Sequence, residues 1–356
     1  MALELKNITK KVKGRTHIKD TSLTLEAGHF NVLLGETGAG KTSLIKLMAG
    51  LDRCSSGSIM MDGRDVTRLS TQKRNISLVH QFFVNYPHMT VFENIASPLR
   101  VAGMAKSEIE GRVDDVAGLL QLRPMLQRYP HELSGGQQQR TALARAIAKE
   151  SNAVFLDEPL ANLDYKLREE LREQLPELFA GRGTVVVYAT SEPEEALLLG
   201  GKTGLMQDGR ITQFGPTADI YRRPANLVSA SVFSNPPINQ INVTKKDGRI
   251  GLDQTTVEWT AGGAANALAD GSYIMAIRPN DVLPIRSDAA NVAVSGTITV
   301  TELSGSESSA HFTFAGRNWV SLAHGIHPYK TGTDRTFYIN PEKCFFFLPD
   351  GEMAAR

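Results

Sequence analysis

The chain has few cysteines, no long apolar run and almost no net charge. Its two cysteines, Cys54 and Cys344, stand far apart in 356 residues, which argues against a disulfide framework and favours a reducing compartment. No apolar run approaches the roughly 20 residues of a membrane-spanning helix. We therefore expect any membrane role to depend on a partner protein.

Neither sign of charge dominates. The sequence has 39 Lys and Arg residues against 38 Asp and Glu residues, for a formal net charge of +1. This balance gives no indication of a nucleic-acid or acidic partner. Residues 1–11 alternate apolar and polar side chains as a first strand does, and they lack the apolar core of a signal peptide. The length is sufficient for two or three domains, each with its own core.

Residues 29–51 contain a full match to the phosphate-binding loop pattern G-x-x-x-x-G-K-[ST]. We expect antiparallel strands over residues 2–34, of which the apolar run 30–34 is the last. Helix-spaced apolar residues follow the match up to Gly50, which is placed as a C-terminal cap. The matching residues are Gly35, Glu36, Thr37, Gly38, Ala39, Gly40, Lys41 and Thr42.

A strand, a glycine loop and a helix start are what polyphosphate binding needs. The glycines allow backbone N–H groups to close around a polyphosphate, and the helix start adds positive potential. Lys41 is expected to reach the β- and γ-phosphates of a nucleotide. The hydroxyl of Thr42, with Ser43 beside it, is expected to bind Mg²⁺.

Two later strands also end in polar side chains. Gln81 follows the strand predicted over residues 76–80, where its amide oxygen is able to complete a Mg²⁺ shell or orient water. Taken alone, an isolated glutamine is more often a solvent-exposed residue. Asp157 and Glu158 end a buried parallel strand predicted over residues 153–158. There Asp157 is placed to hold the Mg²⁺ shell and Glu158 to act as general base toward water.

The region between these strands changes character. Residues 82–91 are rich in aromatic and apolar side chains, and helices are predicted over residues 91–104 and 106–120. This pattern favours an inserted helical subdomain with an adhesive surface, although ordinary core packing accounts for many of these side chains.

A second helix start with bare N–H groups follows. Ser134 is a good N-cap for a helix that runs to about residue 149, and Gly135 and Gly136 leave its first N–H groups uncovered. The start of this helix, including Gln137, is therefore a candidate second anion site.

These motifs resemble those of ATP-binding cassette (ABC) ATPases in order and spacing, over about residues 1–235. They are the phosphate loop, Gln81, LSGGQQQR (133–140), FLDEP (155–159) and LANLD (160–164). The resemblance implies an α/β P-loop NTPase with a RecA-like core, an antiparallel β subdomain and a helical subdomain at about 82–150. It also implies a head-to-tail dimer, with each ATP between one subunit's phosphate loop and the other's Ser134, Gly135, Gly136 and Gln137.

The subgroup follows from other segments. Residues 86–95 and 221–226 look like those of ATPase subunits of binding-protein-dependent importers of sugars, polyols and glycerol phosphate. From about residue 236 the composition is typical of strands and turns, and residues 277–279 and 303–307 match the all-β, OB-like TOBE domain appended in that subgroup. In relatives this domain makes subunit contacts and can bind regulators. In this chain the segment lacks a basic, aromatic-rich strip. OB folds often bind nucleic acid through such a strip, so we expect no nucleic-acid partner.

Two positions depart from the family pattern. Val12 stands where relatives have an aromatic residue that stacks on adenine, a contact worth roughly 1–3 kcal/mol, and nearby His17 is a possible substitute. Ser191 stands where relatives have a histidine that contacts the γ-phosphate. Both departures weaken the site on this chain's own phosphate loop and leave its signature residues intact. This favours the weaker-site half of a heterodimer over a homodimer in which Glu158 suffices.

The sequence thus predicts an ATP- and Mg²⁺-dependent ATPase subunit of a solute importer. Lys41 and Thr42 would hold phosphate and Mg²⁺, Gln81 and Asp157 would complete the metal environment, and Glu158 would be the base. The expected partners are a second ATPase subunit, two permeases that contact residues of about 82–95, and indirectly a solute-binding protein. The expected location is peripheral, on the cytoplasmic face of the membrane, and glycerol is the favoured solute. The alternative is a soluble regulatory ABC ATPase without a permease.

Overall fold

The computed structural model describes residues 1–161, 163–288 and 291–355. Asn162 of the LANLD motif therefore lies outside the described residues. The chain divides into two compact units, Met1–Ala218 and Asp219–Arg356, and each is considered separately. The domain boundary expected after residue 235 lies 17 residues after the start of the second unit at Asp219. None of the helices in the described ranges is long and apolar enough to cross a membrane.

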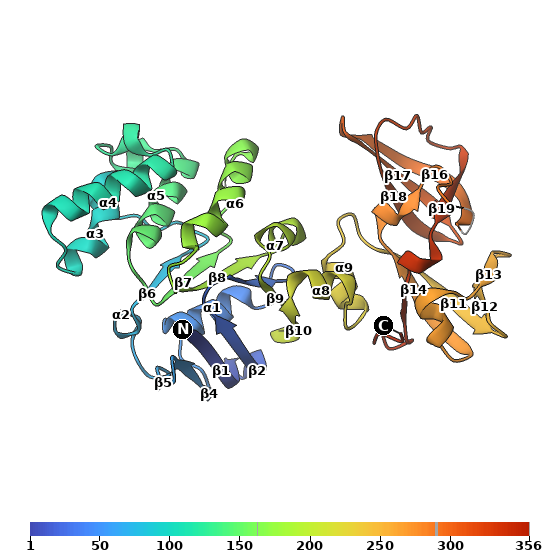
Figure 1. The fold of residues 1–356 in the computed structure, drawn as a ribbon, viewed down its shortest axis with the longest axis horizontal. Coiled ribbons are helices and arrows are strands. Elements are labelled where there is room, and N and C mark those ends of the chain that lie inside the picture. The colour runs from blue at the N-terminus through green and yellow to red at the C-terminus, as the bar shows by residue number, and fades with distance from the viewer. Residues whose placement is uncertain (162, 289–290, 356) are drawn as a thin grey trace. The chain divides into compact units, whose positions relative to one another are not determined.

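A six-stranded sheet in the order β10-β9-β3-β8-β7-β6 forms the centre of the first unit (Figure 1). The pairs β3–β8, β3–β9, β7–β8 and β6–β7 are parallel, and β10 pairs antiparallel with β9. The strands are β3 (Phe30–Leu34), β6 (Ile76–Val79), β7 (Ala153–Asp157), β8 (Val185–Thr190), β9 (Lys202–Gln207) and β10 (Arg210–Pro216).

Both faces of this sheet are covered, which explains why its central strands read as continuous apolar runs. On one face, Val185 and Val187 of β8 join the core cluster that includes Leu44 of α1 (Lys41–Ala49). On the other face, the ring of Phe30 packs edge-on against Tyr188 and against Phe179 of α6 (Tyr165–Phe179). The phosphate loop thus leaves a rigid, fully buried strand.

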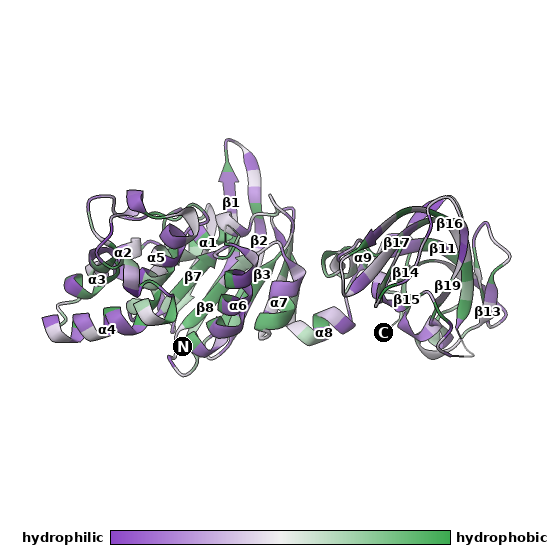
Figure 2. Ribbon diagram, turned by 90° about the horizontal axis from the view of Figure 1, so that it is seen from above, coloured by the Kyte–Doolittle hydropathy of each residue, from purple (hydrophilic) through white to green (hydrophobic). Residues whose placement is uncertain are grey.

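A separate antiparallel sheet, in the order β2-β1-β4-β5, lies beside the core sheet (Figure 1). The hairpin of β1 and β2 projects beyond the rest of the unit (Figure 2). The expectation that residues 30–34 continue this antiparallel set is wrong, because β3 pairs in parallel with β8 and β9. The strands are β1 (Ala2–Val12), β2 (Arg15–Glu26), β4 (Ser56–Met61) and β5 (Arg64–Asp65).

Helices between β6 and β7 form a subdomain (blue-green in Figure 1). Thr90 caps the first of these helices, and its buried residues Val91, Ile95 and Leu99 recur at helical spacing. The helices are α3 (Val91–Val101), α4 (Lys106–Leu119), η1 (Arg123–Met125), η2 (Pro130–Glu132) and α5 (Gly135–Ala148). The remaining helices that begin in this unit are α2 (Thr71–Arg74), α7 (Pro193–Leu199) and α8 (Thr217–Arg222).

The second unit begins with the last residues of α8 and continues with the whole of α9 (Leu227–Val232). Two five-stranded antiparallel sheets follow. Their inward faces enclose one core that includes Trp319, Phe312 and Phe337, and these two sheets form an OB-like β barrel. The first sheet contains β11 (Asn239–Lys246), β12 (Arg249–Leu252), β13 (Glu258–Thr260), β14 (Gly271–Ile277) and β20 (Phe345–Phe347). The second contains β15 (Val282–Leu283), β16 (Val292–Leu303), β17 (Glu307–Phe314), β18 (Arg317–His324) and β19 (Asp334–Ile339). Short helices η3 (Gly263–Ala267), η4 (Pro279–Asp281) and η5 (Pro341–Lys343) connect them.

Candidate nucleotide-binding site

The phosphate loop, residues 35–42, joins β3 to α1 and requires glycine at specific positions. Gly40 is the N-cap of α1 and has φ 108°, a left-handed conformation that other residues rarely adopt. A Cβ atom at Gly35 would collide with the carbonyl oxygen of Met206, so only glycine allows this close approach. Glu36, Thr37 and Gly38 are exposed, whereas Ala39 is buried. The loop therefore presents its backbone at the start of a helix, where N–H groups favour an anion.

Lys41 is turned back into its own loop. Its Nζ donates hydrogen bonds to the carbonyl oxygens of Gly35 at 2.6 Å and Glu36 at 3.1 Å, and it lies 3.6 Å from Oε1 of Glu158. The side chain is 5% exposed, and this burial lowers the pKa of the Lys41 ammonium. The Lys41 ammonium is therefore held by two carbonyls of its own loop and by the Glu158 carboxylate.

Thr42 and Asp157 meet across the gap between α1 and β7. The Thr42 hydroxyl donates to Oδ1 of Asp157 at 3.1 Å. Oδ2 of Asp157 is buried and has no hydrogen-bond partner among the described residues, and burial raises the pKa of this carboxyl. A buried carboxylate oxygen without a partner is destabilising unless a cation joins it. Ser43, half-buried on the next position of α1, makes no hydrogen bond to this pair in the described residues.

Gln81 and Glu158 form the polar end of the neighbouring strands. Nε2 of Gln81 donates to Oε2 of Glu158 at 2.9 Å. Glu158 has φ 48°, an uncommon left-handed conformation, and its N–H donates to the carbonyl of Ala189 at 2.9 Å. The structure therefore brings Lys41, Thr42, Gln81, Asp157 and Glu158 together at the carboxyl ends of the parallel strands.

The signature segment, Ser134–Gln137, starts α5 in the helical subdomain. The Ser134 hydroxyl accepts from the N–H of Gln137 at 3.3 Å, and Oε1 of Gln137 accepts from the N–H of Ser134 at 3.0 Å. This reciprocal capping box fixes the segment locally. Ser134 and Gly135 are exposed, so the segment is accessible to another molecule.

The two residues that depart from the family pattern, Val12 and Ser191, both lie at the ends of strands. Val12 ends β1 opposite Arg15, and its side chain is 39% exposed. Ser191 is exposed directly after β8. His17 is exposed on β2, and the structure shows no side-chain hydrogen bond from it within the described ranges.

Sequence reasoning missed a buried network beside Ser191. Oε2 of Glu195 accepts from the hydroxyls of Tyr188 at 2.9 Å and Thr190 at 2.6 Å, and Arg172 lies 3.5 Å from its other oxygen. Burial is the largest cause that raises the pKa of Glu195. The available signal was the pair Arg168 and Arg172, one helical turn apart on α6 and matched by acids after β8.

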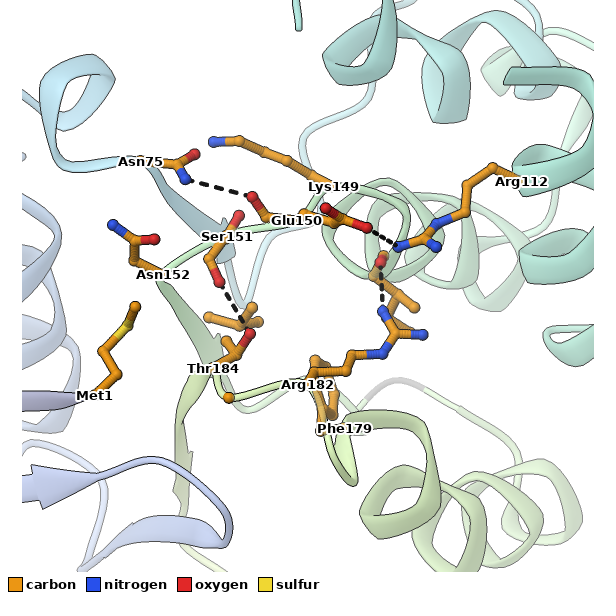
Figure 3. A pocket seen from close by; sticks show the side chains of 13 residues that line it. Met1, Asn75, Arg112, Lys149, Glu150, Ser151, Asn152, Phe179, Arg182 and Thr184 are labelled. Carbon is orange, nitrogen blue, oxygen red and sulfur yellow. Dashed lines mark hydrogen bonds and ion pairs between the residues drawn. The ribbon is translucent and has the colours of Figure 1, made fainter. Parts of the chain in front are cut away.

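A cavity of about 570 Å³ lies at the opposite, amino-terminal edge of the core sheet (Figure 3). It is bounded by Asn152 and Thr184, which precede β7 and β8. Arg112 and Arg182 on its wall donate to the carbonyls of Ala148 and Ile147 and so cap the end of α5. Capping of α5 therefore explains the presence of these two arginines on the cavity wall. The cavity is not part of the nucleotide site.

The core sheet, the phosphate loop and the signature helix define an ATPase of the cassette class. A family model for ABC transporters matches residues 18–161, and a model for the TOBE domain matches residues 275–347. The chain is 33% identical to the putative uncharacterized ABC transporter ATP-binding protein YcjV of Escherichia coli K12, with 99% of each chain covered. It is 36% identical to the sn-glycerol-3-phosphate import ATP-binding protein UgpC of Yersinia enterocolitica, with 99% and 98% covered.

Solved structures agree with this assignment. The dimeric post-hydrolysis state of the ATP-binding cassette MJ0796 bound to ADP and Pi is similar with a TM-score of 0.56 and 28% identity, covering 60% of this chain and 98% of that one. The chain belongs to the ABC transporter family, as an ATP-binding protein and ATPase with a C-terminal TOBE domain. The expected fold class and family are confirmed.

Proposed function

We propose that the chain is the ATP-hydrolysing subunit of a binding-protein-dependent importer for a carbohydrate, polyol or glycerol-type solute, with glycerol favoured. Relatives named for sn-glycerol-3-phosphate import support this solute class. The selective pocket would belong to two permeases and an external binding protein. Through the permeases, the ATPase would be held peripherally at the cytoplasmic face of the membrane.

The convergence of Gln81, Lys41 and Glu158 is the observation that carries the catalytic proposal. Lys41 and the backbone of the phosphate loop would bind the β- and γ-phosphates of ATP. Glu158 would accept a proton from the attacking water, and Gln81 would orient that water or complete the metal shell. Nucleotide binding would draw the Lys41 ammonium from Glu158 to the phosphates, which frees the carboxylate to act as base.

Mg²⁺ fits the residues at the end of β7. The Asp157 oxygen without a partner and the Thr42 hydroxyl beside it are the oxygen donors that this hard cation prefers. When bound, Mg²⁺ supplies positive charge to the β- and γ-phosphate oxygens. We propose Thr42, Gln81 and Asp157 as the protein side of the metal environment.

The two departures support a heterodimer with one weaker ATP site. Val12 provides no aromatic ring for adenine, and Ser191 provides no imidazole for the γ-phosphate. By contrast, Ser134 and Gly135 of the signature segment are exposed and intact, so they would serve the nucleotide on a partner with a competent site. The other candidate is a homodimer in which Glu158 supports slow turnover at both sites.

A groove beside the segment after Gln81 supports contact with a permease. It has a volume of about 370 Å³, and its walls come from β6, α3 and α5 and include Tyr86, Pro98 and Ala142. Phe82 and Val101 near this region are 82% and 91% exposed. Exposed large apolar side chains beside a groove are typical of a surface that receives another protein. We propose that residues of about 82–95 take part in this contact.

The domain proposal is an ATPase domain over residues 1–235 and a TOBE domain over residues 236–356. The experiment that tests the function is membrane fractionation of the chain with and without candidate permeases, followed by ATPase assays on the assembled complex. Permease-dependent recovery in the membrane fraction, with ATPase activity that needs a second cassette subunit, is the expected result. A chain that stays in the soluble fraction beside every permease would favour the regulatory alternative.

A further inference from the structure

The turn that carries Ser191 is held from one side by an ion-pair cluster. The N–H of Glu192 donates to the Thr190 hydroxyl at 3.0 Å, so the residues on both sides of Ser191 are bonded to each other. The two carboxylate oxygens of Glu192 accept from Arg168 and Arg172 of α6, each at 3.2 Å. The carboxylate thus fixes the turn to two successive turns of α6.

Arg168 reaches in a second direction from the same guanidinium group. Its NH1 group bonds to Glu192, while its NH2 group donates to the carbonyl of Ala161 at 3.2 Å and to that of Leu163 at 3.4 Å. These carbonyls belong to the loop after Glu158, described over residues 159–161 and 163–164. Because the guanidinium is planar and its N–H groups are rigidly placed, it sets the distance between the Ser191 turn and this loop.

The same loop packs against the start of the signature helix. Nε2 of Gln139, which is 2% exposed, donates to the carbonyl of Pro159. A Cβ placed on Gly136 would lie 3.4 Å from Cδ2 of Leu163, so the Leu163 side chain packs closely against the start of α5. The loop therefore contacts α5 at two successive turns.

We propose that Arg168 and Glu192 are positioning residues that couple the nucleotide on this chain's phosphate loop to its own signature segment. The inference rests on the proposed function, in which Ser191 occupies the position of a γ-phosphate contact in relatives, and the N–H of Gly35 in the phosphate loop donates to the carbonyl of Thr190 at 3.4 Å. A shift of that turn on nucleotide binding moves the Glu192 carboxylate, Arg168 carries the shift to the carbonyls of residues 161 and 163, and Pro159 and Leu163 pass it to α5.

Through this connection, the position of the signature segment would depend on whether the ATP site of its own chain is occupied. In a head-to-tail dimer, that segment closes over the partner's nucleotide. Coupling between the two sites is a free energy that needs a physical element biased by both of them. The bridge from Glu192 through Arg168 to the loop provides this element within one subunit and without a ligand contact of its own.

Hydrogen exchange of the intact chain, with and without the Mg²⁺ complex of a non-hydrolysable ATP analogue, tests the coupling. In the unaltered chain, the analogue is expected to slow exchange in three peptides: residues 35–45, 159–165 and 133–140. In Arg168→Gln, the analogue should bind with unchanged affinity and still protect residues 35–45. Protection of residues 159–165 and 133–140 should fall by about tenfold, within the usual range of coupling between sites.

Two further variants complete the design. Glu192→Gln removes the bridge from its other end, so it should reproduce Arg168→Gln, and the double variant should lose no more than either single one. Lys166→Gln on the same helix changes a side chain that is 88% exposed and whose ion pair, among the described residues, is with Glu170, so it should behave as the unaltered chain. If one single variant fails to fold, the other carries the test alone.

The contradicting outcomes are distinct. Full protection of residues 159–165 and 133–140 in both Arg168→Gln and Glu192→Gln would overturn the coupling. So would an unaltered chain in which the analogue protects residues 35–45 and leaves the other two peptides unchanged. Absence of protection at residues 35–45 would instead overturn the proposed nucleotide site.

Discussion

Nε2 of Gln81 donates a hydrogen bond to Oε2 of Glu158 across 2.9 Å, between the ends of two parallel strands. The other oxygen of Glu158 lies 3.6 Å from the Lys41 ammonium. The proposed base is therefore held by the two groups that nucleotide and metal would engage. In the proposed mechanism, release of Glu158 would depend on the binding of nucleotide and metal, and nucleotide occupancy would thereby control catalytic competence.

Replacement of Lys41 by alanine should strongly weaken nucleotide binding. A hydrogen bond from a charged group contributes about 1.5–3 kcal/mol, which corresponds to a loss of roughly tenfold to more than a hundredfold in affinity. Equilibrium binding of a fluorescent ATP analogue measures the loss. Lys46→Ala, on the same helix and outside the phosphate loop, is the matched control. An affinity equal to that of the control, in a folded Lys41→Ala chain, would show that the loop is not the nucleotide site.

The two thiols should differ sharply in reactivity. Cys344 is buried, and burial raises the pKa of its thiol far above its usual range, so little reactive thiolate forms at neutral pH. Cys54 is half-buried and is therefore the thiol that a reagent reaches first. A thiol-reactive chromophore at pH 8 should label one cysteine per native chain and two after denaturation, and Cys54→Ser should remove the native label. Equal, rapid labelling of both native thiols would contradict this account of the barrel core.

Truncation should separate the ATPase from the barrel. The phosphate loop, Gln81 and Glu158 all lie in the first unit, and the second unit has a core of its own. A chain that ends at residue 235 should remain soluble and bind ATP. Residues 219–235 keep their partners only in the full chain, because Leu227 bonds to Gly351 and the guanidinium of Arg278 lies 3.7 Å from the ring centre of Tyr221.

A chain that ends at residue 218 should therefore unfold at a temperature at least as high as the chain that ends at 235. Circular dichroism and nucleotide binding of both truncated chains provide the comparison. Unfolded product from both truncations would show that the two units share a core.

Local patterns in the sequence predicted much of the fold. Apolar runs indicated β7 and β8 because a covered parallel sheet buries every side chain of a strand. Ser134 and Gly50 marked helix ends because capping chemistry is local. The pairing of β3 was not predictable in this way, since a five-residue apolar run does not specify which strands lie beside it.

In the candidate site too, local motifs were predictable from the sequence, whereas contacts between distant segments were not. A motif predicted the phosphate loop, and the family pattern indicated Gln81, Asp157 and Glu158. The bridge formed by Arg168 between Glu192 and the carbonyl of Ala161 depends on how the start of α6 lies relative to the turn after β8. Charged residues on a helix surface are usually solvated, so the spacing of Arg168 and Arg172 was only a weak signal in the sequence.

The asymmetric heterodimer predicts unequal effects of one substitution. Loss of one well-placed polar contact to a developing charge costs on the order of 10²–10³ in rate. The site on this chain already lacks the histidine, so Glu158→Gln here should cost little of the total turnover. Ser134→Arg should be severe, because a bulky cation at the exposed N-cap would block closure over the partner's competent site.

The most direct test is the steady-state ATPase rate of the reconstituted transporter with Glu158→Gln in this chain, compared with the equivalent change in the partner ATPase. The account predicts a small loss from the first and loss of most activity from the second. Equal losses from the two substitutions, or full activity of this chain assembled with itself, would contradict it.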